Sequence, residues 1–422
     1  MVEFITPTKP NSVNNLNYNS PSECILGAID IGTNSIHMVV VKIDTSLPSF
    51  FIIAKEKDTV RLGDRDPKTG NLTQEAMARS LAALSRCKDL AASLNVDKLI
   101  AVATSATRES PNGEAFLAEI AAKLGIKVDL ISGQEEARRI YLGVLSGMEF
   151  KNEPHVIIDI GGGSTELILG DGKEARYLSS TKVGAVRLAK KFITSDPISE
   201  KEYIAISAYV RGMLERAVDG IWQNLEIHET PRLVGTSGTI ETLAIVHALT
   251  TQGSEPNPLS GYQVSRTDLE RVVKRLVKLT YKERADFPGI SDKRAEIIVP
   301  GAIILLEAMK MLKLDSITIC ERALREGVIV DWMLSQGYIE NRLRYQGEVR
   351  KRNIYKIARK YSVDLEYAER VAKFALDIFA QTKGILHDWG DSERELLEAA
   401  AILHNCGLYI NHSAHHKHSY YL

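Results

Sequence analysis

Two aspartates in this chain each stand at the head of a loop built from glycine and hydroxyl residues. Asp30 begins the segment Asp-Ile-Gly-Thr-Asn-Ser, and Asp159 begins the segment Asp-Ile-Gly-Gly-Gly-Ser. The apolar run before each aspartate places its carboxylate at the end of a strand, and the glycines let backbone N–H groups approach an anion closely. Each segment therefore predicts half of a phosphate clamp.

The sequence around these loops predicts the elements that hold them. Each loop is followed by another apolar run, at 37–41 and at 167–169, which predicts a β-hairpin with the loop at its tip. A third glycine-rich turn, at 235–239, follows an apolar strand and precedes a helical pattern. One glycine-rich turn often only reverses a hairpin, but three turns of one chemical kind favour phosphate binding.

The two hairpins and the later Gly-x-x-Gly turn resemble the actin, Hsp70 and sugar-kinase superfamily, in which two duplicated domains close over a phosphate-bearing ligand. Within it, the chain resembles the exopolyphosphatase and guanosine pentaphosphate phosphohydrolase family. The resemblance covers nearly the whole chain after an unmatched N-terminal tail. Five ordered stretches carry it: Ala28–Val41, Ala103–Arg108, Ile131–Arg138, Ile158–Leu167 and Gly235–Thr242.

The resemblance implies an α/β fold of two duplicated ribonuclease H-like (actin-like) domains with a cleft between them, followed by an all-α HD-like domain. The order of apolar strands and helices restarts near Pro154, which predicts a boundary between Gly147 and Pro154. We expect a disordered leader at 1–22, a first domain at 23–150, a second at 151–337 and a helical domain at 338–422. Periodicity predicts helices over 73–94, 113–124, 199–225, 239–250 and 292–312, and strands over 98–103, 127–131 and 315–320.

The C-terminal part contains a stretch, Ala399–Gly407, that resembles the core of an HD-type phosphohydrolase domain. Such a domain holds a metal through His followed by Asp, whereas here Asn405 follows His404. An amide brings no charge to offset a dication, so we expect a metal-free module. The chain ends at Leu422 inside what resembles a helix of the family, which predicts a truncated domain. The remaining histidines fit no closed zinc pattern, and we interpret them as structural or surface groups: His412, His415, His416 and His418.

A pair of glutamates, Glu135 and Glu136, follows Ser132 where a strand is expected to turn into a helix. Both lie in the first helical turn, near the positive end of the helix dipole, where either could simply stabilise the helix. We favour that role for Glu135. The resemblance implies that Glu136 activates the attacking water as a general base.

A second pair of carboxylates, Asp159 and Glu166, flanks the second loop, and both can point into one cleft. Magnesium prefers one or two carboxylates, with water and substrate phosphate completing its shell, so this pair predicts a Mg²⁺ site. Asp30 could add a ligand through water from the facing loop. A surface strand position is the alternative for Glu166, and a K⁺ requirement stays open.

The remaining candidates are anion donors. Arg108 can bind phosphate oxygens in bidentate fashion, although a salt bridge at a helix start is its alternative role. Three further cations are candidate phosphate contacts of second rank: Lys182, Arg187 and Arg325. The predicted phosphate-binding residues are Asn34, Ser35, Ser105, Arg108, Gly161, Gly162, Gly163, Ser164, Gly235, Ser237 and Gly238.

Composition indicates a globular enzyme. The chain has 422 residues, of which 44% are hydrophobic and 25% charged, enough for two or three well-formed domains. Its four cysteines are scattered, which favours a reducing cytoplasm. The longest apolar candidate, Ile297–Leu306, is interrupted by Pro300 and Gly301, so no membrane span is expected. The stretch Asn341–Lys360 has eight Lys or Arg and one acid, which fits a solvated basic helix or a track for a polyanion.

These features lead to a reaction hypothesis: a Glu136-activated water attacks the terminal phosphoryl group of inorganic polyphosphate, and orthophosphate is released one unit at a time. The first alternative is removal of the 5′ γ-phosphate of guanosine pentaphosphate (pppGpp). The second is an actin-like protein that binds a nucleotide without hydrolysing it. The resemblance implies a homodimer, and nothing in the sequence indicates a nucleic-acid partner.

Overall fold

The computed structural model describes residues 23–44, 49–339 and 349–422. The expected disordered leader at 1–22 lies outside the described residues, as do residues 341–348, which begin the basic segment. Within the described part, no helix combines the length and the apolar character that a bilayer crossing needs.

The first sheet has five strands in the order β3-β2-β1-β4-β5. β1 pairs with β2 and β2 with β3 in antiparallel fashion, whereas β1–β4 and β4–β5 are parallel. Asp30 ends up opposite His37, which is opposite Lys57, so these three side chains form a row at the end of the sheet. The strands are β1 Glu23–Ile31, β2 Ile36–Asp44, β3 Ser49–Asp58, β4 Lys98–Ala103 and β5 Val128–Leu130.

The second sheet repeats this order and these directions in β8-β7-β6-β9-β11, and β10 is added in antiparallel fashion at its edge. Here Asp159 is opposite Glu166, which is opposite Ser180, so the second sheet ends in a matching row. The predicted α/β class is therefore confirmed, with two mixed sheets. The strands are β6 His155–Ile160, β7 Thr165–Gly170, β8 Ala175–Thr181, β9 Arg232–Thr236, β10 Gln263–Ser265 and β11 Ser316–Ile319.

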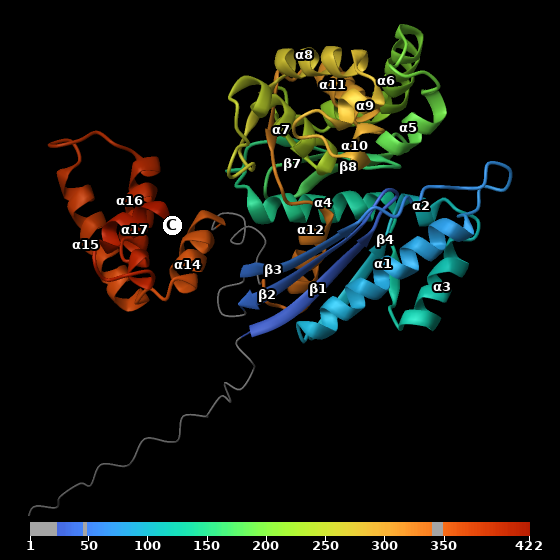
Figure 1. The fold of residues 1–422 in the computed structure, drawn as a ribbon. Coiled ribbons are helices and arrows are strands. Elements are labelled where there is room, and N and C mark those ends of the chain that lie inside the picture. The colour runs from blue at the N-terminus through green and yellow to red at the C-terminus, as the bar shows by residue number, and fades with distance from the viewer. Residues whose placement is uncertain (1–22, 45–48, 340–348) are drawn as a thin grey trace, which may run out of the picture.

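Two helices, α4 (Gly133–Gly147) and α12 (Leu324–Ser335), lie between the sheets (Figure 1). α4 follows the first sheet in the chain but packs on β7 and β8 of the second, while α12 packs on β1 and β2 of the first. The helices cross very closely: a methyl group added to Gly143 would lie 2.0 Å from the Ala323 carbonyl oxygen, and one added to Gly327 only 1.7 Å from that of Arg139. This pair joins both sheets in one apolar core.

The outer faces of the sheets are covered by separate sets of helices. α1 and α3 cover the first sheet, and α1 begins after Thr73, whose hydroxyl accepts a hydrogen bond from the Ala76 N–H. The second sheet is covered by α5, α6, α7, α8 and α11. Their bounds are α1 Gln74–Ser93, α2 Ser105–Arg108, α3 Gly113–Leu124, α5 Ala185–Phe192, α6 Glu200–Gln223, α7 Gly238–Thr251, α8 Arg266–Lys278, α9 Tyr281–Ala285, α10 Asp292–Ala295 and α11 Ile298–Met311.

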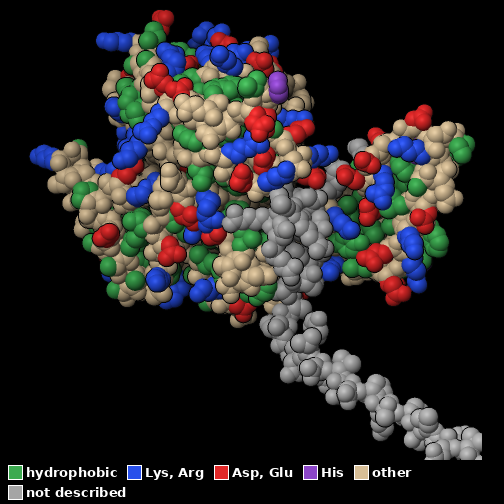
Figure 2. Space-filling model, turned by 180° about the vertical axis from the view of Figure 1, so that it is seen from behind, with side chains coloured by type: hydrophobic (Ala, Val, Ile, Leu, Met, Phe, Trp, Pro, Cys, Tyr) green, Lys and Arg blue, Asp and Glu red, His purple; other side chains and the backbone are tan. Residues whose placement is uncertain are grey.

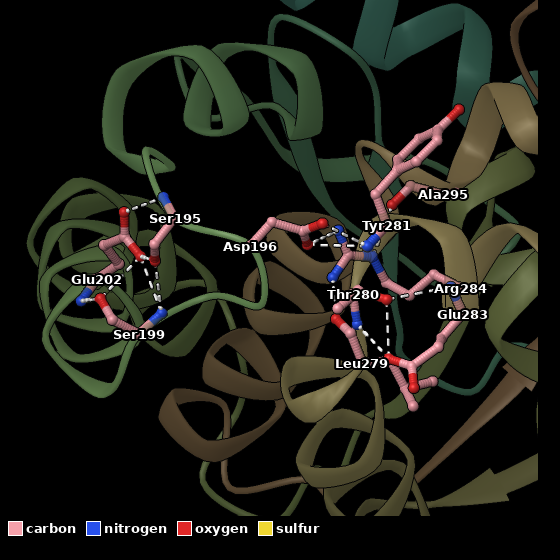
Figure 3. A network of polar contacts seen from close by, with 10 residues as sticks. All are labelled: Ser195, Asp196, Ser199, Glu202, Leu279, Thr280, Tyr281, Glu283, Arg284 and Ala295. Atoms are coloured by element: carbon pink, nitrogen blue, oxygen red, sulfur yellow. Dashed lines mark hydrogen bonds and ion pairs between the residues drawn. The ribbon is translucent and has the colours of Figure 1, made fainter.

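A polar network holds α9 and α10 beside the start of α6 (Figure 3). Asp196 accepts a hydrogen bond from the Tyr281 N–H at 2.8 Å and forms an ion pair with Arg284 at 3.4 Å. The Arg284 Nε–H also donates to the Ala295 carbonyl at 2.9 Å. Because Ala295 follows Arg294 directly, this network fixes the short helix that carries Arg294.

The C-terminal part, beyond residue 349, contains helices and one isolated β-bridge among its described residues. Its helices form a small core of their own and a separate lobe in Figure 1. Arg359 of α14 forms an ion pair with Asp44, and the Lys356 ammonium lies 4.6 Å from the Phe51 ring centre, so α14 contacts the first sheet. The bounds are α14 Val349–Lys360, α15 Leu365–Thr382, α16 Asp391–Leu403, the 3₁₀ helix η1 Cys406–Tyr409 and α17 His415–Tyr421.

The predicted elements are largely confirmed, with two differences. The helix expected over 292–312 is divided, because α10 ends at Ala295 and α11 begins at Ile298. The sequence patterns also missed several elements, namely strands β8 and β10 and helices α2, α5, α8, α9 and α12. The proposed domain boundaries remain a prediction, since α4 and α12 each pack on the sheet of the other half.

Candidate active site

The tips of the two predicted hairpins meet at a cleft between the sheets. Both tips adopt the same turn: the Gly32 N–H donates to the Ser35 carbonyl at 3.1 Å, and the Gly161 N–H donates to the Ser164 carbonyl at 3.0 Å. The second tip lies against the first half, because a methyl group added to Gly163 would be 2.2 Å from the Ser105 Oγ. Only glycine allows this approach, which brings the backbone N–H groups of both loops to one space.

Asp159 and Glu166 are opposite one another on β6 and β7, so their side chains share one face of the hairpin. Asp159 is 8% exposed and Glu166 is 1% exposed. Burial, together with the charges of Glu136 and Asp30, raises the pKa of Asp159 to about 8. Burial also raises the pKa of Glu166, although its carboxylate accepts a hydrogen bond from the Ser180 hydroxyl at 2.7 Å. Burial therefore outweighs the nearby cations, and neither carboxylate of the pair forms an ion pair with a described residue.

Asp30 adds a third carboxylate at the same end of the cleft. Its Oδ1 atom is buried and has no hydrogen-bond partner among the described residues, and burial raises the pKa of the side chain to about 6. Within the described ranges, no three His, Cys, Asp or Glu side chains form a preassembled metal centre. Magnesium needs only one or two carboxylates beside substrate oxygens, so these residues fit Mg²⁺.

Glu136 lies beside the carboxylate pair of the second hairpin, in the first turn of α4, which packs on β7 and β8, and it is 7% exposed. Ser132 caps this helix by accepting a hydrogen bond from the Glu135 N–H at 3.1 Å. Arg108 donates to the Glu136 Oε2 at 3.2 and 3.3 Å. Burial and the nearby Glu166 nevertheless raise the pKa of Glu136. A raised pKa makes the ionised Glu136 carboxylate a stronger base towards water.

Glu135 differs from its neighbour in its contacts. Its carboxylate accepts hydrogen bonds from Arg138 and Arg139, each at 2.7 Å, and the Arg138 side chain also donates to Asp331 of α12 at 2.7 Å. These bonds lower the pKa of Glu135. Glu135 therefore links the first turn of α4 to α12, in agreement with a structural role.

The third predicted loop completes the cleft at the start of α7. Ser237 has φ +87° and ψ 154°, a conformation that is costly for any residue with a side chain. Its hydroxyl donates to the Ile160 carbonyl at 3.0 Å and so joins this loop to the second hairpin. Gly238 lies directly beneath the Arg294 guanidinium, since an added methyl group would be 1.9 Å from Nη2.

Most predicted residues come together, but four do not line the cleft. Arg108 bonds to Glu136 and to the Ile131 carbonyl, Gly235 is buried in β9 against Ile317, and Lys182 is exposed after β8. Arg187 donates to the Gly163 carbonyl and to Glu109, so it clamps the two halves together behind the loop. The predicted residues that line the cleft are Asp30, Asn34, Ser35, Ser105, Glu136, Asp159, Gly161, Gly162, Gly163, Ser164, Glu166, Ser237, Gly238 and Arg325.

Among the further residues that line the cleft are two ionisable ones that the sequence patterns missed, His37 and Arg294. Burial, followed by the charges of Arg325, Lys57 and Arg294, lowers the pKa of His37 to about 2, so this imidazole stays neutral. Its position was recognisable, because His37 occupies in the first hairpin the place that Glu166 occupies in the second. Arg294 comes from a four-residue helix with no such signal.

A fold of two matching mixed sheets, with carboxylates and glycine loops in the cleft between them, is that of a phosphatase of the Ppx/GppA type. The model of the Ppx/GppA phosphatase family matches residues 39–336, and that of Ppx/GppA phosphatase domain III matches residues 349–422. The chain belongs to this family, whose members hydrolyse phosphoanhydride bonds.

Individual relatives include two kinds of enzyme. The chain is 31% identical over 410 residues to the guanosine-5′-triphosphate,3′-diphosphate pyrophosphatase of Vibrio parahaemolyticus, covering 95% of this chain and 76% of the relative. It is 29% identical to the crystal structure of an exopolyphosphatase from Cytophaga hutchinsonii, with a TM-score of 0.68 over 75% of this chain and 99% of that one. The chain is also similar to the crystal structure of the Aquifex aeolicus family member. Here the sequence identity is 27% and the TM-score 0.63, over 74% of this chain and 99% of that one.

Proposed function

We propose that this protein removes the terminal phosphoryl group of a linear polyphosphate chain by attack of water. The observation that carries the proposal is that a buried glutamate with a raised pKa, Glu136, lines the same cleft as the buried pair Asp159 and Glu166 and lies close to both. Glycine-rich loops, whose backbone N–H groups can donate to an anion, line the same cleft. This arrangement provides a base, a cation site and anion donors within one space.

Each group then has a defined part in the reaction. Glu136 takes a proton from the attacking water as the water oxygen bonds to phosphorus, and the bridging P–O bond breaks to leave a shorter chain. Arg108 keeps Glu136 in place through its two hydrogen bonds. Asp159 and Glu166 would hold Mg²⁺, with Asp30 contacting it through water. The ion would neutralise charge on the phosphoryl oxygens.

We propose inorganic polyphosphate as the first substrate and pppGpp as the second. Arg294 and Arg325 line the cleft, and neither makes an ion pair with another described residue, so both can receive phosphates. The exopolyphosphatase relative supports the first substrate and the Vibrio relative supports the second. Membership of a phosphatase family leaves little support for the third hypothesis, an actin-like protein without hydrolysis.

Part of the basic stretch Asn341–Lys360 forms α14, and two of its cations contact the first sheet. Arg359 and Lys356 of α14 turn towards Asp44 and Phe51 of the first sheet, so they are not simply solvated. Acidic and basic side chains are interspersed on the face drawn in Figure 2. A polyanion track would therefore follow the junction of α14 with the first sheet.

Further features of the protein belong to the same proposal. The matching sheets support duplicated actin-like domains, and we propose a C-terminal HD-like module for the helices from α14 onward. All four cysteines are free, which supports a cytoplasmic location. The family resemblance supports a homodimer. No nucleic-acid partner is proposed.

The decisive experiment measures orthophosphate release from long-chain polyphosphate and from pppGpp, with Mg²⁺ and after its removal by a chelator. The Glu136→Gln variant should lose about 10²- to 10⁴-fold in kcat, because a general base contributes that much. Its thermal unfolding should stay close to that of the unmodified protein. Full turnover by this variant would reject Glu136 as the base, and undiminished release after chelation would reject the metal site.

A further inference from the structure

A carboxylate with no assigned part in the reaction, Glu241, lies one helical turn from the wall of the cleft. It belongs to the first turn of α7, whose preceding loop contributes Ser237 and Gly238 to the cleft lining. Residues three and four apart share a face of a helix, so Glu241 lies on the same face as these two residues. Its side chain is half-buried.

Three cations and one acid from different elements lie near Glu241: Arg325 from the start of α12, Arg294 from α10, Lys57 from β3, and Glu321, which follows β11. Even so, the Glu241 carboxylate makes no hydrogen bond or close ion pair with any residue that the structure describes. Burial raises the pKa of Glu241 against the pull of these cations. The carboxylate thus lies near more cations than acids, without a direct partner among the described residues.

A carboxylate in this place discriminates between the two candidate substrates. Inorganic polyphosphate presents acceptor oxygens and negative charge, both of which Glu241 repels. A nucleoside polyphosphate presents phosphates to Arg294 and Arg325, and it also carries ribose hydroxyl and base N–H donors that a carboxylate accepts. An enzyme site built around such a hydrogen bond discriminates strongly against substrates that lack the donor.

We propose that Glu241 accepts a hydrogen bond from the nucleoside part of a nucleoside polyphosphate and thereby allows the cleft to take the nucleotide as a second substrate beside inorganic polyphosphate. This inference rests on the proposed phosphatase function. Glu136 and the magnesium ligands act on the terminal phosphoryl group of either substrate, whereas Glu241 acts on the nucleotide alone.

The test compares kcat/KM for pppGpp and for inorganic tripolyphosphate in the unmodified protein and in Glu241→Gln. The variant should lose about ten- to a hundred-fold with pppGpp, the value of one charge-assisted hydrogen bond. With tripolyphosphate, the kcat/KM of the variant should be unchanged or higher. Glu270→Gln, which alters a glutamate of α8 that pairs with Lys274 outside the cleft lining, is the matched control and should change neither rate.

Substrate analogues identify the donor. A 2′-deoxy analogue of pppGpp lacks the ribose 2′-hydroxyl, and an inosine analogue lacks the 2-amino group of the base. If the unmodified protein and Glu241→Gln turn over one of these analogues equally, the group absent from that analogue is the one that Glu241 binds. Equal losses with pppGpp and tripolyphosphate would overturn the inference, since they would show that Glu241 only positions the arginines. Unchanged rates with both substrates would overturn it as well.

Failure of the proposed function would be visible separately, as absence of orthophosphate release from both substrates by the unmodified protein. Calorimetric binding of guanosine triphosphate then tests the inference without turnover. Weaker binding by Glu241→Gln than by the unmodified protein would uphold the role of Glu241, and equal binding would overturn it.

Discussion

At the scale of single residues, the cleft concentrates carboxylates whose burial outweighs the attraction of the cations near them. Asp30, Asp159, Glu166 and Glu136 are held close together with their pKa values raised by burial. Perturbed acids gathered in one cleft are typical of catalytic sites. Because burying these ionisable carboxylates destabilises the metal-free fold, a cation bound between them should stabilise the protein.

This cost leads to a prediction about pH. Unfolded Asp159 ionises near its ordinary pKa of 3.8, while in the fold its pKa is about 8, so folding becomes less favourable as pH rises between these values. Without metal, Asp159→Asn should therefore be more stable than the unmodified protein at pH 8 and only slightly so at pH 5. One pKa unit corresponds to about 1.4 kcal/mol, so we expect a difference on the order of a few kcal/mol.

Denaturant unfolding in the presence of a chelator at both pH values provides the measurement. Mg²⁺ should stabilise the unmodified protein and have little effect on Asp159→Asn. The matched control is Asp89→Asn, which changes an exposed aspartate of α1. An equal effect of Asp159→Asn at pH 5 and pH 8 would contradict the prediction.

At the scale of elements, the cleft depends on the crossing of α4 and α12. α4 carries Glu136 in its first turn, and α12 carries Arg325 in its first turn. Gly143 and Gly327 let the two backbones touch where larger residues would separate them. The ion pairs of Arg138 and Arg139 with Asp331 fix the same crossing. The proposed catalytic base and a cation of the cleft lining are therefore positioned by one helix pair.

Gly327→Ala tests this role of the crossing. The added methyl group would meet the Arg139 carbonyl oxygen at 1.7 Å, which forces the helices apart. Overpacking of this kind costs about 1–3 kcal/mol, and we expect a loss of kcat beyond the loss of stability because Glu136 moves. Gly212→Ala is the matched control: it lies within α6, and an added methyl group there meets nothing within 4 Å.

Thermal unfolding and orthophosphate release measure both effects. Gly212→Ala should gain about 0.5–1 kcal/mol, since alanine favours a helix interior over glycine, with turnover unchanged. A Gly327→Ala protein as stable and as active as the unmodified protein would show that the close crossing is not required.

At the scale of the whole molecule, the site exists only where the two halves meet. Thr33 and Ser105 of the first half contact Gly163 of the second, and Arg187 bonds to Glu109 across the same boundary. The C-terminal helices add a junction between α14 and the first sheet, where Lys356 and Arg359 lie. Burial together with the nearby Arg322 and Lys360 lowers the pKa of Lys356 to about 8.

If this junction guides a polyanion, salt should distinguish long from short substrates. Each phosphate contact releases counterions, so KM for long-chain polyphosphate should rise steeply between about 50 and 200 mM salt, while KM for tripolyphosphate rises less. Steady-state kinetics over a series of KCl concentrations measures both slopes. Equal slopes for the two substrates would reject the track along α14.

The sequence alone determined the local chemistry of this protein. Strands that end in Asp-x-Gly and glycine loops have few other conformations available, so the residue pattern by itself placed Asp30 and Asp159 at hairpin tips. The first-turn position of Glu136 followed from the cap at Ser132. These features depend on neighbours in the chain, which a sequence displays directly.

Only the tertiary structure decided which residues share the cleft. Arg294 reaches the cleft from a four-residue helix. Arg284 holds this helix in place and is itself paired with Asp196, which lies far from Arg294 in the sequence. Arg108 was predicted as a phosphate contact, with a salt bridge as its alternative role, and in the fold it bonds to Glu136, whose burial demands a partner. Such pairings arise from packing between distant segments, and no local pattern encodes them.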